Sequence, residues 1–190
     1  MNPTLIRDRR ELQTIRDVPP WVEAGGRALV SGAVASVLTT LALMALARAY
    51  GKRVHQPTNA TSHWLHGRGA GRVEAVDAAH TAVGFATHHA SAVFWALPFE
   101  RWLTARPNAT ASEIAGAAAV TAVVAAVVDY GVVPRRVSPG WEETLPPRAI
   151  AVVYGVLALG LAAGGLATQR MRAGADRTRR IDAGDWRPSR

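Results

Sequence analysis

All six histidines of this chain lie between residues 55 and 89, and one of them stands close to a carboxylate at helical spacing. Asp77 and His80 are three residues apart, so a helix would place both side chains on one face. A carboxylate and an imidazole so placed are ligands for divalent metals. Asp129 is a third candidate ligand, or an acceptor that orients the imidazole. These residues predict either a metal site or an interfacial hydrogen-bonded network.

Three further histidines extend the metal hypothesis. His63 and His66 precede the pair and would complete a zinc, copper or iron site if they approach it. His88 lies in the middle of a long apolar stretch, where an imidazole can ligate the iron of haem b. The other apolar stretches contain no histidine, so two histidines from facing helices cannot hold one haem. The alternatives are His88 with Met44, single-histidine haem, a divalent metal, or hydrogen bonds between helices.

Four apolar stretches must position these side chains. A bilayer core of about 30 Å needs about 20 helical residues, and each stretch reaches that length. The stretches cover residues 27–50, 76–98, 112–133 and 147–168. We therefore predict an all-α polytopic membrane protein whose residues 27–168 form a compact four-transmembrane-helix bundle. Pro98 is expected to end the second span.

Small residues recur at four-residue spacing within the apolar stretches. Such spacing lets helix backbones approach closely in lipid, where packing rather than hydrophobicity drives association. The sets are Gly160 with Gly164, Gly32 with Ser36, and Ala118 with Ala122 and Ala126. They predict close packing within the bundle or across a homo-oligomer.

Charge patterning suggests the orientation of the bundle. Most of the 22 lysines and arginines flank the side that holds both chain ends, which favours cytoplasmic termini. An Ala-, Val- and Arg-rich chain of this kind is typical of a bacterial inner-membrane protein. The arm over residues 1–26 and the tail over residues 169–190 are polar, and the tail is expected to be disordered. Tail arginines are candidates for binding anionic lipid headgroups: Arg170, Arg172, Arg177, Arg179 and Arg180.

The sequence lacks the signatures of common enzymes. It has no cysteine, no nucleophile elbow, no phosphate-binding loop and no H-E-x-x-H motif. With the proposed orientation, Asp77, His80 and Asp129 cluster near the outer face, and the inner half of the bundle is nearly all apolar. We expect a non-catalytic accessory, structural or binding role, with lipid and a membrane-protein partner or a second copy as partners, and no nucleic acid. The alternatives are a metal- or haem-binding redox subunit and a small proton- or ion-coupled transporter.

Overall fold

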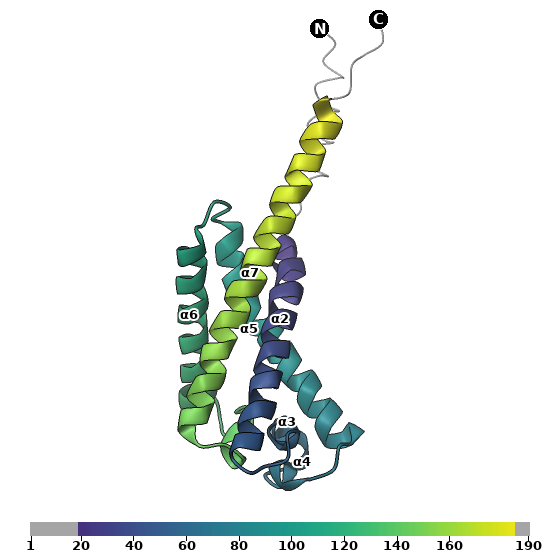
Figure 1. Ribbon diagram of the computed structural model, residues 1–190, viewed down its shortest axis with the longest axis vertical. Helices are drawn as coiled ribbons and strands as arrows, with labels where there is room; N and C mark the ends of the chain where they lie inside the picture. The colour runs from purple at the N-terminus through teal and green to yellow at the C-terminus, as the bar shows by residue number, and fades with distance from the viewer. Residues whose placement is uncertain (1–18, 185–190) are drawn as a thin grey trace, which may run out of the picture.

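Four long antiparallel helices build the protein, and short helices cap one end of them (Figure 1). The computed structural model describes the backbone of residues 19–184 and the side chains of residues 19–178. The long helices are α2 (Pro20–Ala49), α5 (Val83–Thr104), α6 (Ala111–Val127) and α7 (Pro147–Gly184). The short elements are α3 (Gln56–Ala60), α4 (His63–His66), the 3₁₀ turns η1 (Ala70–Arg72) and η4 (Trp141–Glu143), and the π turns η2 (Ala78–Ala82) and η3 (Val128–Val132). The described residues contain helices and no strand, which confirms the all-α prediction.

Three of the long helices are apolar and long enough to cross a membrane. They are α2, α6 together with η3, and α7. These three helices indicate that the protein is embedded in a membrane. Helix α5 is not among them, because His88 and His89 near its middle and Glu100 near its end reduce its hydropathy. The predicted count of four spans is therefore not confirmed.

Two helices end later than the sequence predicted. Helix α5 continues through Pro98 to Thr104, although a proline inside a helix removes one backbone hydrogen bond. Helix α7 continues beyond Thr168 to Gly184, over residues where a disordered tail was expected. The arm over residues 1–18 and the last six residues lie outside the described part of the chain.

Helix α2 packs against both α5 and α7 through small residues. A Cβ atom added to Gly32 of α2 would lie 2.6 Å from the Cα of Val93 in α5. On α7, a Cβ atom at Gly160 would lie 2.5 Å from the Cα of Ala35 in α2, and one at Gly164 would overlap the backbone of Ser31. The close approach predicted for these glycines is confirmed, and it occurs inside one chain.

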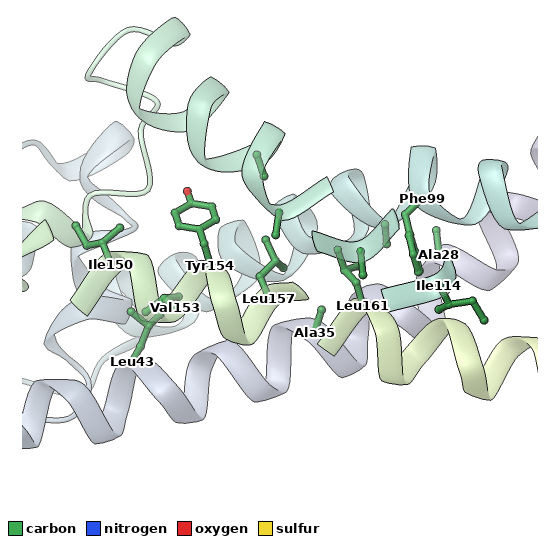
Figure 2. Close-up of a cluster of buried hydrophobic side chains, with 14 of the residues drawn as sticks. Ala28, Ala35, Leu43, Phe99, Ile114, Ile150, Val153, Tyr154, Leu157 and Leu161 are labelled. Carbon is green, nitrogen blue, oxygen red and sulfur yellow. The ribbon is translucent and has the colours of Figure 1, made fainter. Parts of the chain in front are cut away.

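The hydrophobic core lies between these helices (Figure 2). Its buried side chains include Leu43 of α2 and Val153, Leu157 and Leu161 of α7. Phe99 of α5 is buried near the end of the bundle that lies away from the short helices. Helix α6 contributes the buried residues Ile114, Ala118, Ala122 and Ala125. Its opposite face exposes Val120, Val123, Val124 and Val127, which suits contact with lipid.

The cap consists of α3, α4, η1 and η2 with the segments between them (residues 56–82). It is held together mainly by side chains that form hydrogen bonds with backbone carbonyls. Asn59 is fully buried, and its Nδ2 donates to the carbonyl oxygens of Val73 at 2.9 Å and Ala75 at 3.0 Å. Its Oδ1 accepts a hydrogen bond from Thr81 at 2.6 Å. One amide side chain therefore fixes the strap of residues 73–75 and joins it to η2, the turn before α5.

Replacing Asn59 by aspartate is expected to loosen the cap. The aspartate keeps the acceptor for Thr81 but loses both donors, and it places a carboxylate beside two carbonyl oxygens. We expect the free energy of unfolding in detergent to fall by about 2 kcal/mol. Asn108→Asp, in the exposed turn between α5 and α6, serves as the control and should change little. Equal stability of the two variants would show that Asn59 does not hold the strap.

Candidate functional site

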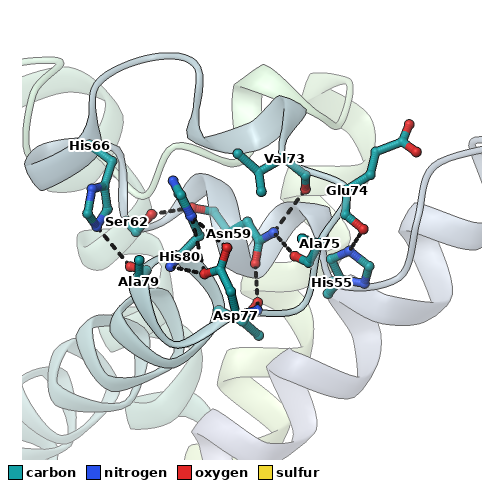
Figure 3. A network of polar contacts seen from close by, with 11 residues as sticks. His55, Asn59, Ser62, His66, Val73, Glu74, Ala75, Asp77, Ala79 and His80 are labelled. Atoms are coloured by element: carbon teal, nitrogen blue, oxygen red, sulfur yellow. Dashed lines mark hydrogen bonds and ion pairs between the residues drawn. The ribbon is translucent and has the colours of Figure 1, made fainter.

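Asp77 and His80 lie together on the cap, as their spacing predicted (Figure 3). The backbone N–H of His80 donates to Asp77 Oδ1 at 2.6 Å, so the carboxylate caps the first turn of η2. The Nδ1 atom of His80 lies 3.0 Å from Asp77 Oδ2. The ring of His66 lies 4.6 Å from the ring of His80, and His66 Nε2 contacts the carbonyl of Ala79 at 2.8 Å. Asp77 and His80 therefore form a hydrogen-bonded pair, and its position at a membrane interface stays a prediction.

His63 serves the cap in a similar way. Its Nδ1 and Nε2 atoms each lie 3.0 Å from a carbonyl oxygen, those of Ala60 and Arg135. The second contact links the cap to the loop that follows α6. A metal at His63 would have to displace one of these contacts.

The candidate metal ligands divide between two places. Asp77, His80 and His66 lie on the cap, whereas His88 and Asp129 face the interior of the bundle. No three histidine or acidic side chains converge on a point that could hold a metal ion, within the residues that the structure describes. The metal or haem site therefore stays a prediction without a converging set of ligands.

His88 is fixed by a contact between helices. It is buried, and its Nε2 atom lies 2.8 Å from Thr39 Oγ1 on α2. Thr39 donates its own hydroxyl proton to the carbonyl of Ala35 at 2.8 Å, so its oxygen accepts from His88 Nε2–H. This assigns the proton to Nε2 and leaves Nδ1 as the acceptor of the ring. The ring also contacts Trp141 edge-on, with 5.6 Å between centroids.

Asp129 is fixed by α7 rather than by a histidine. The hydroxyl of Tyr154 donates to Asp129 Oδ2 at 2.7 Å. Asp129 belongs to the π turn η3, and such turns occur frequently at functional sites because they redirect side chains. Tyr130, in the same turn, packs its ring edge-on against Tyr154.

These side chains surround a cavity between the cap and the bundle. It is called the inner cavity because it lies in the interior of the protein. Its volume is about 300 Å³ and its wall is largely apolar. Among its lining residues are His88, Ser91 and Trp95 of α5, together with Asp129, Trp141 and Tyr154. The Nε1 atom of Trp141 donates to Thr61 of the cap at 3.1 Å, so the cap and the cavity wall are one unit.

Two further hollows adjoin the inner cavity. The outer chamber, of about 520 Å³, shares Asp129 and Ser138 with it and is lined by charged side chains. The α6–α7 groove, of about 570 Å³, is apolar and shares Tyr154 with the inner cavity. Tyr130 lines both the groove and the outer chamber. The three hollows therefore meet around Asp129, Tyr130 and Tyr154.

A buried ion pair lies near the opposite end of the bundle, where the sequence predicted an apolar interior. Glu100 of α5 is fully buried, and its Oε2 accepts from Arg27 Nε of α2 at 2.8 Å. Its Oε1 accepts from Thr168 of α7 at 3.0 Å. The prediction of an apolar inner half was wrong here because the second span was expected to end at Pro98. Continuing that helical pattern past Pro98 would have placed Glu100 inside the bundle.

The tail arginines take different positions. Arg170 and Arg177 are exposed on α7, whereas Arg172 lies 3.6 Å from Glu23 of α2. The side chains of Arg179 and Arg180 lie outside the described part of the chain. Arg172 thus has an acidic partner within the protein.

Comparison of the chain with protein-family models, with curated proteins and with solved structures finds no match, so its function is argued from geometry alone.

Proposed function

We propose that this protein is a four-span inner-membrane protein with cytoplasmic termini that binds a small, largely apolar ligand in the inner cavity. The role is one of binding, without catalysis. The observation that carries the proposal is the inner cavity itself, a hollow of about 300 Å³ whose exposed wall is mostly apolar. Ligand sites in helix bundles have this character, with polar groups that fix the orientation of the ligand.

The polar groups of the cavity are held in place before any ligand arrives. Thr39 fixes the ring of His88, and Tyr154 fixes the carboxylate of Asp129. A ligand that meets fixed groups does not have to order them, which favours its binding. Nδ1 of His88 and the carboxylate of Asp129 are both acceptors, so they suit a ligand that carries a hydroxyl or amine donor.

The fourth span is supported by the position and length of α5. Together η2 and α5 cover 27 residues, from Ala78 to Thr104, and would reach about 40 Å. Helix α5 runs beside the apolar α2 and antiparallel to it (Figure 1). Its one buried carboxylate, Glu100, is paired with Arg27, which reduces the cost of placing it at membrane depth.

The test is to bind a neutral single-chain amphiphile, monoolein, to the purified protein in detergent and to count adducts by native mass spectrometry. The wild-type protein should retain one monoolein per chain. Ser91→Phe places a ring in the cavity and should abolish this adduct, whereas Ala90→Phe, on an exposed position of the same helix, should keep it. The unfolding temperature of both variants shows whether they are folded. Failure of the wild-type protein to bind, or an unchanged adduct in folded Ser91→Phe, would overturn the proposal.

A further inference from the structure

The outer chamber is lined by charged side chains of both signs. Three arginines line it, Arg68, Arg72 and Arg135, and so do Glu142 and Glu143. Within the described part of the chain, none of these arginines lies within the 4.0 Å of a carboxylate that defines an ion pair. Opposite charges are thus gathered around one hollow without neutralising one another directly.

One carboxylate oxygen in this chamber is buried and has no side-chain donor. Glu143 Oε2 is inaccessible to solvent, and among the described residues only the backbone N–H of Gly71 contributes a hydrogen bond to this carboxyl group. Burial also raises the pKa of Glu143 above its usual range. Glu142, by contrast, accepts a hydrogen bond from Ser138 at 2.8 Å. A buried carboxylate oxygen that no cationic side chain contacts is incompletely paired, and a ligand that brings an ammonium group would stabilise it.

The position of the chamber relates it to the inner cavity. The two hollows share Asp129 and Ser138, so a ligand with an apolar body in the inner cavity could extend its polar end into the chamber. Arginine suits phosphate or carboxylate oxygens, because its N–H groups form a planar fork. An anionic head alone would leave Glu143 without a cationic partner, and a cationic head alone would face three guanidinium groups.

We propose that the ligand is a zwitterionic amphiphile, with a phosphate facing Arg68, Arg72 and Arg135 and an amine facing Glu142 and Glu143. This inference rests on the proposed function, because it places the hydrocarbon chain of the same ligand in the inner cavity. A lipid of the phosphoethanolamine class has this chemistry, and it would reach the site from the bilayer. The α6–α7 groove is apolar and meets both hollows at Tyr130 and Tyr154, which provides an apolar surface for that approach.

The test compares three single-chain probes with the same oleoyl chain by native mass spectrometry. They are lysophosphatidylethanolamine, with phosphate and amine, lysophosphatidylglycerol, with phosphate alone, and monoolein, with neither. The expected order of affinity places lysophosphatidylethanolamine first, by about tenfold over lysophosphatidylglycerol, since one charge-assisted contact distinguishes them. Equal affinity for the three probes would overturn the inference and leave the proposed function standing. A protein that binds none of them would overturn both.

Two variants test the roles of the charges. Glu143→Gln should remove the preference for lysophosphatidylethanolamine over lysophosphatidylglycerol, and Arg135→Gln should weaken both phosphate probes about tenfold. Both variants should still bind monoolein, which also shows that they are folded. The matched controls are Glu74→Gln and Arg136→Gln, whose side chains do not line the chamber. Variants that bind all probes like their controls would contradict the assignment.

A competition experiment with a soluble headgroup distinguishes binding of a lipid from binding of a free headgroup. Phosphoethanolamine without a chain should not displace bound lysophosphatidylethanolamine at equal concentration, because it gains nothing from the inner cavity. Displacement at equal concentration would show that the chamber binds a soluble zwitterion, and would overturn the proposal that the ligand is an amphiphile.

Discussion

Glu100→Ala is expected to lower the free energy of unfolding by about 3–5 kcal/mol. The substitution leaves the guanidinium of Arg27 with only the more distant carboxylate of Glu23, at 3.6 Å, and it removes one of the two acceptors of the Thr168 hydroxyl. Three helices meet at this carboxylate, so the loss should affect the packing of all three. The measurement is unfolding of the purified protein by denaturant in detergent.

Two further variants distinguish the effect of losing the ion pair from the effect of losing the volume of its side chains. Glu23→Gln removes a half-buried partner of the same arginine, at 3.6 Å, and should cost less than about 1 kcal/mol. The double variant Arg27→Met/Glu100→Leu should recover most of the stability lost in Glu100→Ala, because no charge is then left unpaired. If Glu100→Ala were no less stable than Glu23→Gln, the pair would have no structural role.

The second large effect is expected where α2 and α7 touch. In the double variant Gly160→Ala/Gly164→Ala, each new methyl group would collide with the backbone of α2, at Ala35 and at Ser31. Backbone cannot move aside as a side chain can, so the helices must separate. Each overpacked site costs about 1–3 kcal/mol, and the pair should cost about 4 kcal/mol. Unfolding in denaturant measures this loss.

Gly155→Ala is the matched control on the same helix. A Cβ atom there meets nothing within 4 Å, so the substitution should be neutral or should stabilise α7 by up to about 1 kcal/mol. A double variant as stable as this control would show that α2 and α7 do not need to approach closely.

The helices that the sequence predicted best are those with a strong local signal. Unbroken apolar runs predicted α2, α6 and α7, and the four-residue spacing of Gly160 and Gly164 predicted where a neighbouring helix would touch. The pairing of Asp77 with His80 also followed from spacing, because both residues lie in the same turn. These features depend on residues that are close in the chain.

The features that the sequence did not predict depend on distant residues. Asn59 contacts the strap, and Trp141 contacts Thr61. These contacts join segments without apolar periodicity, so the sequence predicted only loops over most of the cap. Glu100 was missed because Pro98 was taken as the end of a helix, although tertiary packing carries α5 past it. The inner cavity arises only when α5, the cap and α7 are assembled, and no single segment encodes it.

The continuation of α7 past Thr168 changes which electrostatic partner suits the tail. In an extended, flexible tail, every arginine can settle onto an anionic membrane surface. In Figure 1, α7 instead leaves the bundle along its long axis and raises each successive residue by about 1.5 Å. Arg177 therefore stands about 10 Å farther from the bundle than Arg170, which equals the screening length of salt water at 0.1 M. If the bundle spans the membrane, we expect Arg177 to interact more weakly with lipid headgroups than Arg170 does.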